Sequence, residues 1–166
     1  MTPLKLQDVL VGKNSDDGGL LGHILRDLRT IDSRQPFNIY DNSPIQRQYG
    51  DDKSVYPYCF STLGDGEDNG ETAKQEVVII VASYSVDEAY SGYRDVMNAL
   101  ERIRQYFMKY PDGNDNIISF PYGSFFEALK PVKWRAPEPS SYAPVFVGGL
   151  NISFRLPGIS RISPYI

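Results

Sequence analysis

The strongest hydrophobic pattern in the chain lies between residues 76 and 108. Residues 77–81 form an unbroken run of β-branched side chains without glycine or proline, which is typical of a buried strand. From Tyr93 to Met108, apolar residues recur every three or four positions, which predicts one long helix over about residues 88–109. Its apolar face holds Tyr93, Val96, Met97, Leu100, Ile103 and Phe107, and its polar face holds Arg94, Asp95, Asn98, Glu101, Arg102 and Gln105. We expect the apolar face to pack on the strand and form the centre of the core.

The N-terminal part of the chain, 1–31, carries the signals of two short helices. Thr2 followed by Pro3 is typical of a helix N-cap and first helical position, and Gly12 is a typical end. A second apolar stripe at helical spacing covers 20–31. We expect both helices to pack on the same sheet as the long helix.

Two strand-like segments joined by an acidic turn predict a β-hairpin over residues 56–84. The first strand is 56–63, and the second is the β-branched run described above. Between them, residues 64–71 are rich in glycine, aspartate and glutamate, so we expect a solvated, flexible tip. Upstream, 37–40 is a short strand candidate inside a long irregular connection, 32–54.

The C-terminal part predicts a second pair of strands. Apolar and polar residues alternate along 145–156, which indicates one buried and one solvated face. The neighbouring glycines Gly148 and Gly149 suggest a bulge in that strand. Residues 129–135 are a weaker strand candidate, and 117–120 are a short one.

The order of these elements indicates an α+β fold. Helices come first, followed by a hairpin, a long helix and a second hairpin. This order favours an antiparallel or mixed sheet of about four to five strands with helices on one face. With 166 residues, the chain suits a single domain, 1–166. Within it we distinguish the N-terminal helices (1–31), the connection (32–54), a core of sheet and main helix (55–158) and a C-terminal tail (159–166).

Composition narrows the classes of function. The net charge is −4 and no block of lysine or arginine is present, which argues against nucleic acid as the main ligand. No apolar run is long enough to span a bilayer, and the N-terminus lacks the apolar stretch of a signal peptide, so we expect folding in a cytoplasm. The single cysteine, Cys59, excludes an internal disulfide, and the single histidine, His23, excludes a histidine cluster.

The residues that could carry chemistry form no recognisable active-site motif. The carboxylates of 64–71 superficially suggest a calcium loop, but their spacing and strand-like flanks differ from those of an EF-hand. Ser91, and a capping box of Ser85 with Glu88, are alternative N-caps for the long helix. His23 has no acid or thiol partner in a motif. We therefore predict no catalytic, cofactor-binding or metal-ligating residue.

Aromatic residues are frequent, with twelve tyrosines among them. Many lie in loop-like stretches, where they either cover the edge of the core or take part in a protein interface. Trp134 lies between Lys133 and Arg135, and we expect it in the core with solvated neighbours rather than on nucleic acid. Cys59 is expected to behave as a small buried side chain.

Several segments occur in an order that resembles a known family. They are a hydrophobic strand with a DGED turn, a second strand, a helix that reads GYRDVMNALERIR, and a closing pair of strands. These segments are 56–60 with 64–68, 77–83, 92–104, 129–134 and 154–157. Over about residues 55–158, their order and spacing are similar to those of tail completion proteins of siphophages and prophages.

This resemblance implies a tail completion or tail terminator role. Such proteins assemble as a ring, commonly a hexamer, at the head-proximal end of the tail tube, where the ring stops tube polymerisation and docks the head connector. The implied partners are copies of the same chain, the major tail tube protein and a head connector or stopper protein, with no membrane, cofactor or specific nucleic acid. The implied location is the host cytoplasm during assembly and then the virion tail. The connection 32–54 and the aromatic segment 120–128 are longer than the family pattern.

We expect contacts between subunits, or with the tail tube, to involve aromatic and acidic residues on long loops. The candidates are Tyr40, Tyr49, Asp65, Glu67, Asp68, Tyr122, Phe125, Phe126 and Tyr142. Three other interpretations remain: another head–tail joining protein such as a neck or stopper component, a small hydrolase that uses the carboxylates of 65–71, and a nucleic-acid-binding adaptor.

Overall fold

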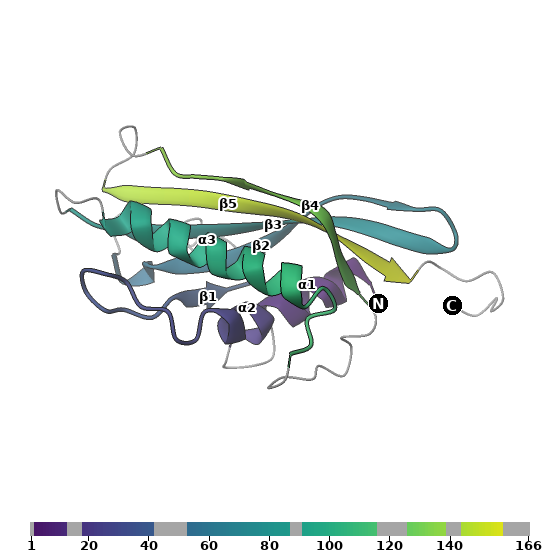
Figure 1. Cartoon of the computed structure of the whole chain (residues 1–166), viewed down its shortest axis with the longest axis horizontal. Helices are drawn as coiled ribbons and strands as arrows, with labels where there is room; N and C mark the ends of the chain where they lie inside the picture. Colours follow the sequence, from purple (N-terminus) through teal and green to yellow (C-terminus); the bar gives the residue numbers. More distant parts are fainter. Residues whose placement is uncertain are drawn as a thin grey trace.

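The computed structural model describes six stretches of the chain, namely residues 2–12, 18–41, 53–86, 91–115, 126–138 and 144–157. Within these ranges it contains helices and a sheet, which confirms the α+β class (Figure 1). The elements are α1 (Pro3–Val11), α2 (Gly19–Ile24), β1 (Asn38–Tyr40), the 3-10 helix η2 (Lys53–Val55), β2 (Tyr58–Asp68), β3 (Thr72–Tyr84), α3 (Ser91–Lys109), β4 (Glu127–Arg135) and β5 (Val145–Pro157). The strand candidate at 117–120 lies outside the described residues.

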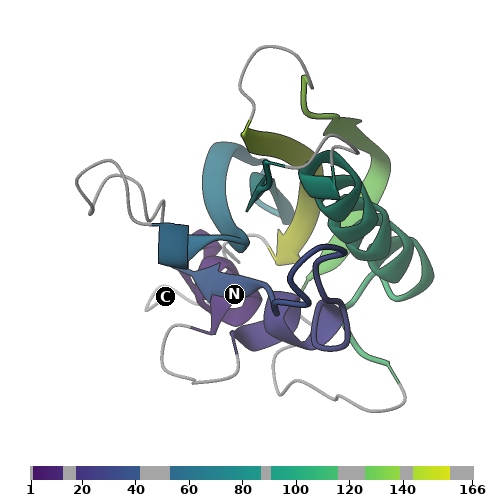
Figure 2. The ribbon, with the colours of Figure 1, turned by 90° about the vertical axis from the view of Figure 1, so that its left-hand side faces the viewer.

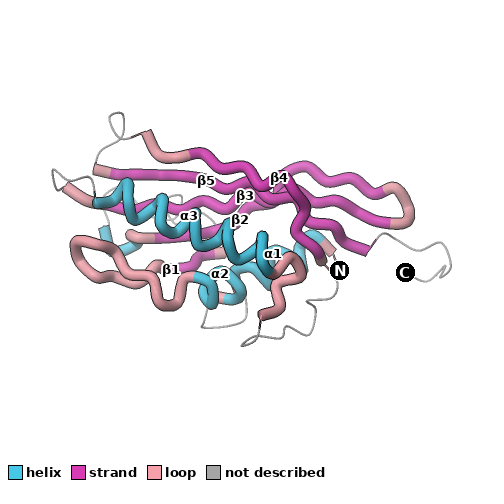
Figure 3. Tube along the Cα trace, in the orientation of Figure 1, coloured by secondary structure: helices cyan, strands magenta, loops and turns pink. Residues whose placement is uncertain are grey.

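The five strands form one mixed sheet in the order β1-β2-β3-β5-β4 (Figure 3). The short strand β1 runs parallel to β2, and every other neighbouring pair is antiparallel. The β-branched run therefore lies in the central strand, as its composition predicts. Because side chains alternate between the two faces of a sheet, this register defines which residues share a face.

The helices α1, α2 and α3 lie together on one side of the sheet, which curls around them (Figure 2). On this inner face, Val77, Ile79 and Val81 of β3 are fully buried. α3 packs over β3 and β5, and α1 packs over β2. Gln7 of α1 joins the edge of β2 directly, because the Ser61 hydroxyl donates to its side-chain oxygen at 2.8 Å.

The apolar face of α3 is buried as predicted, but a charged residue is buried with it. Val96, Leu100 and Phe107 are each at most 1% exposed. Asp95, which the pattern places on the solvent face, is only 3% exposed. Its carboxylate accepts a hydrogen bond of 2.9 Å from the backbone N–H of Ile31, because the loop after α2 folds over this part of the helix.

Of the two helices predicted at the start of the chain, the first is confirmed and the second is shorter than predicted. Thr2 caps α1 by accepting a hydrogen bond from the backbone N–H of Lys5, and Gly12 ends the helix in a left-handed conformation. α2 ends at Ile24, so the predicted helical stripe does not continue to Ile31, whose side chain is 49% exposed. A loop replaces the last part of the predicted helix, and the Thr30 hydroxyl closes this loop by accepting a hydrogen bond from the backbone N–H of Gln35. Hydrogen bonds between a threonine side chain and the nearby backbone compete with those of a helix.

The predicted bulge at Gly148 and Gly149 is absent from the pairing of β5 with β3, whose register is continuous there. The register shift lies instead between β4 and β5, between Leu129 and Lys133. Pro131 lies inside this interval and has no N–H to continue the ladder. The reason for a glycine at 148 is the helix above it: an added Cβ would lie 2.8 Å from a methyl carbon of Val96.

Candidate assembly surfaces

The structure describes five of the nine residues predicted to take part in contacts between chains. Asp65, Glu67 and Asp68 are exposed on the β2–β3 hairpin, as expected. Phe126 is not available for contact, because it is 3% exposed and its ring packs edge-on against Phe154 in the core. Tyr40 of β1 is half-buried. Tyr49, Tyr122, Phe125 and Tyr142 lie outside the described residues.

The acidic segment is a continuation of the hairpin and not a loose turn. β2 extends to Asp68, so the predicted tip at 64–71 shrinks to the three residues between β2 and β3. A register shift between Leu63 and Gly66 interrupts the pairing, and the buried side chain of Gln75 fills it by donating to the Gly64 carbonyl at 2.9 Å. Glu67 and Asp68 are therefore held on paired positions, opposite Lys74 and Ala73, and Asp65 lies within the register shift.

Side-chain hydrogen bonds close the hairpin at its end. The backbone N–H of Gly70 donates to the Asp68 carboxylate at 2.7 Å, and that of Thr72 donates to the Asn69 side chain at 2.9 Å. Gly70 has a φ of 90°, which favours glycine at this position. Figure 1 shows that this hairpin extends beyond the helices, and residues 64–69 are exposed. We call residues 64–71 the acidic tip.

The outer face of the sheet, opposite the helices, carries a cluster of aromatic rings. Tyr58 is 3% exposed and lies between Tyr56 and Phe60, with ring centroids 5.2 and 5.9 Å away. Tyr40 of β1 packs edge-on against Tyr58 at 6.3 Å and is half-buried, so it belongs to this cluster rather than to an exposed loop. Burial, with a smaller contribution from Tyr56, raises the pKa of Tyr58 to about 12.

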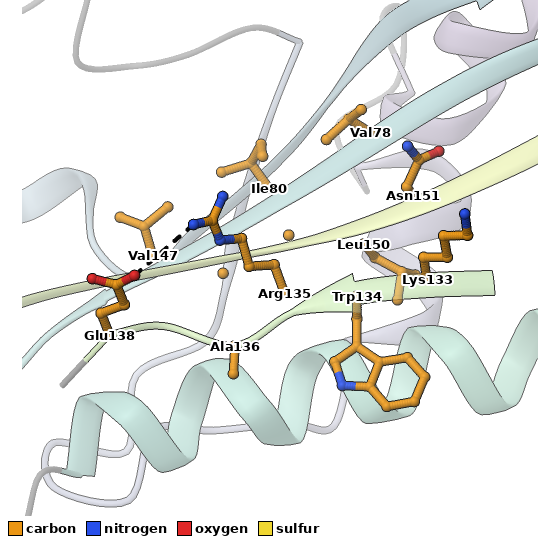
Figure 4. Close-up of a pocket in the computed structure, with 12 residues that line it drawn as sticks. Val78, Ile80, Lys133, Trp134, Arg135, Ala136, Glu138, Val147, Leu150 and Asn151 are labelled. Atoms are coloured by element: carbon orange, nitrogen blue, oxygen red, sulfur yellow. Dashed lines mark ion pairs between the residues drawn. The ribbon is translucent and has the colours of Figure 1, made fainter.

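Beside this cluster, the outer face forms an open groove of about 650 Å³ over β3, β5 and β4 (Figure 4). Val78, Ile80 and Val147 provide apolar floor, and Gly149 leaves the floor hollow. The register places Ile80 and Gly149 in one row with Arg135 of β4. The groove is also lined by Lys133, Glu138 and Asn151. We call this feature the outer groove.

Trp134 corrects a prediction, because its side chain is 53% exposed and not part of the core. β4 is the last strand of the sheet, so the indole has a neighbouring strand on one side only. Figure 4 shows the ring directed away from the groove, towards α3. There the Arg104 guanidinium lies 5.3 Å from the centroid of the indole, as in a cation–π contact.

His23 has an acid partner that no sequence motif indicates. Its Nε2 lies 2.7 Å from Oδ2 of Asp115, and each side chain is 10% exposed. The two residues are 92 positions apart, so their proximity depends on the packing of α2 beside the segment that follows α3. The edge of Tyr106 packs against the imidazole, and burial, followed by the charge of Asp115, raises the pKa of this phenol.

The other residues considered for chemistry are in ordinary surroundings. Cys59 is fully buried as predicted, and burial raises the pKa of its thiol. The Ser85 hydroxyl accepts a hydrogen bond from the backbone N–H of Gly92 at 2.8 Å, so Ser85 supports the start of α3, which begins at Ser91. Among the described residues, no group of three or more His, Cys, Asp or Glu side chains could hold a metal ion.

Comparisons with known proteins do not assign the chain to a family. No family model matches the sequence, and no curated protein matches it either. In the part of the chain that the structure describes, none of the helices has the length and apolar character needed to cross a membrane.

Proposed function

We propose that this chain is a structural protein of a tailed phage or prophage, a tail completion or terminator protein that forms a ring on the end of the tail tube. The observation that carries the proposal is the β2–β3 hairpin, which extends past the helix layer with its acidic residues exposed (Figure 1). The resemblance of residues 55–158 to the tail completion family supplies the biological setting.

A projecting hairpin of this kind adds little to the stability of an isolated domain. Residues 64–69 are exposed, so they bury little apolar surface on folding. β5 supports the arm by pairing with β3 as far as Thr72, which lies opposite Pro157, but this pairing leaves the acidic residues of β2 exposed. In a ring, by contrast, each subunit needs two different surfaces that fit each other head to tail, and an ordered arm is suitable for one of them.

The outer face of the sheet supports the same proposal. Val147 is 43% exposed, and Val78 and Ile80 are half-buried, although all three belong to central strands. Among the described residues, η2 packs on this face only beside Tyr58, where its Val55 is buried, and α1, α2 and α3 lie on the other face. A second layer is needed to bury such a face completely, and another protein chain can provide it.

The partners that follow from this proposal are further copies of the chain, the tail tube protein and a head connector or stopper protein. The first experiment measures self-association by size-exclusion chromatography with light scattering, at increasing protein concentration and in the presence of tail tubes. We expect a discrete ring-sized species under at least one of these conditions. A species that stays monomeric throughout would contradict the proposal.

The second experiment distinguishes a terminator from a neck protein by electron microscopy of tails assembled with and without the chain. Over-long tubes in its absence are the expected result for a terminator. Tubes of normal length that fail to join heads would instead assign a neck or stopper role, which is the alternative within the same virion.

A further inference from the structure

The outer groove is bordered on one side by a basic stretch of β4. Residues 130–135 include three bases and no acid. The Arg135 side chain is 87% exposed, and its nearest ion-pair partner, Glu138, is 3.9 Å away and also largely exposed. An exposed pair at this distance is weak, so Arg135 keeps most of its capacity to bind a carboxylate.

The acidic tip has the opposite charge and a defined shape. Residues 64–71 include four acids and no base, and Lys74 is the first base that follows them. The side chains of Gln75, Asp68 and Asn69 hold the backbone of this hairpin by the hydrogen bonds described above. Docking an ordered hairpin costs less conformational entropy than docking a flexible loop.

The tip and the groove of one molecule cannot meet. Both are parts of one sheet: Glu67 of the tip lies opposite Lys74 of β3, and Val78 and Ile80 of β3 lie in the groove floor. Four to six residues of extended strand separate Lys74 from these floor residues, which is about 13–20 Å at about 3.3 Å per residue. Because the strand is paired on both sides, it cannot fold back on itself. A contact between tip and groove therefore requires two chains.

From this complementarity we propose that the outer groove receives the acidic tip of a second copy of this chain. Asp65 and Glu67 of one subunit pair with Lys133 and Arg135 of the next, and the hairpin covers the apolar floor. Each subunit uses its tip on one neighbour and its groove on the other, which is the head-to-tail geometry that closes a ring. The inference rests on the proposed function and specifies which surfaces form its subunit contact.

The contact can be tested with two double variants, one that reverses the charge of the acidic tip and one that reverses the charge of the outer groove. Asp65→Lys with Glu67→Lys makes the tip basic, and Lys133→Glu with Arg135→Glu makes the groove acidic. Asp68 is left unchanged because its carboxylate closes the hairpin. Each variant alone then opposes surfaces of like charge, and we expect its self-association to weaken about tenfold or more.

Mixing the two variants is the decisive experiment. The basic tip of the first fits the acidic groove of the second, and the acidic tip of the second fits the basic groove of the first. An equimolar mixture is therefore expected to recover assembly in light scattering, with the two variants alternating. Variants that each assemble like the wild type, or a mixture that stays dissociated, would overturn the proposed contact.

Matched controls carry the same change of charge at exposed positions elsewhere. Asp27→Lys with Asp32→Lys, and Arg94→Glu with Arg102→Glu, are expected to assemble like the wild type. Thermal unfolding of every variant verifies folding. If the wild type assembles but the groove variants do not weaken it, the contact is wrong while the ring stands. If the wild type never assembles, both the proposed function and the proposed contact are wrong.

Discussion

The imidazole of His23 and the carboxylate of Asp115 form a largely buried contact, with Nε2 and Oδ2 2.7 Å apart. This contact joins α2 to the segment that follows α3. Nδ1 of His23 has no hydrogen-bond partner among the described residues, so the contact with Asp115 is what orients the ring. It links parts of the core that no strand pairing connects.

We predict that His23→Ala lowers the free energy of unfolding by about 1–3 kcal/mol, because the variant leaves a buried carboxylate without its imidazole partner. Chemical denaturation measures this loss. A double-mutant cycle with Asp115→Ala is the control: the double variant should lose less than the sum of the two single variants. Strictly additive losses would show that the two side chains do not interact energetically.

Gly148 and Gly149 are adjacent but face opposite sides of β5, and they should respond differently to alanine. A Cβ at 148 would lie 2.8 Å from Val96 and 2.9 Å from Leu100, whereas one at 149 would lie 3.5 Å from Ile80. We expect Gly148→Ala to cost about 1–3 kcal/mol by pushing α3 away from the sheet. Gly149→Ala should stay within about 0.5 kcal/mol. Equal losses in thermal or chemical unfolding would contradict this packing.

Leu100 lies between α3 and the sheet and is 1% exposed. Leu100→Ala removes apolar contacts and leaves a cavity, so it should lower the free energy of unfolding by about 2–5 kcal/mol. Asn98→Ala, on the exposed side of the same helix, is the matched control and should change it by less than about 0.5 kcal/mol. A denaturant titration in which both variants behave alike would mean that the buried face of α3 is assigned incorrectly.

The aromatic cluster predicts a loss of stability at alkaline pH. The pKa of Tyr58 rises from 10.0 to about 12 on folding, mainly because burial disfavours the phenolate. The unfolded chain therefore releases this proton first, and the stabilisation that is complete below pH 10 is lost as the pH rises towards 12. Denaturant titrations across this range should show the decline, and Tyr58→Phe should make it shallower. Identical slopes for the variant and the wild type would refute the assignment.

The sequence by itself determined the elements whose signal is local. The β-branched run at 77–81, the apolar periodicity of α3, the alternation along β5 and the Thr2-Pro3 helix start were each sufficient to predict an element that the structure contains. The reason is that hydrophobic periodicity and capping depend on residues within one or two turns of each other. The α+β class followed from the order of these elements.

Tertiary structure alone decided which side chains are covered. Asp95 is buried although it stands on the polar side of its helix pattern, and Trp134 is exposed although it is the one tryptophan in the chain. The first depends on a loop that folds over α3, and the second depends on β4 being an edge strand. Neither relationship leaves a periodic signal in the chain.

Of the two candidate surfaces, the sequence indicated part of the acidic tip, whereas only the tertiary structure revealed the outer groove. The acidic composition of 64–71 was readable in the sequence, but its extension as a paired hairpin depends on β3 and on the side chain of Gln75. The outer groove was not readable at all, because it combines three strands that are adjacent only through the order β3-β5-β4. Such a surface depends on the pairing register of strands that are far apart in the sequence. That register is fixed only when the assembled sheet buries its inner face.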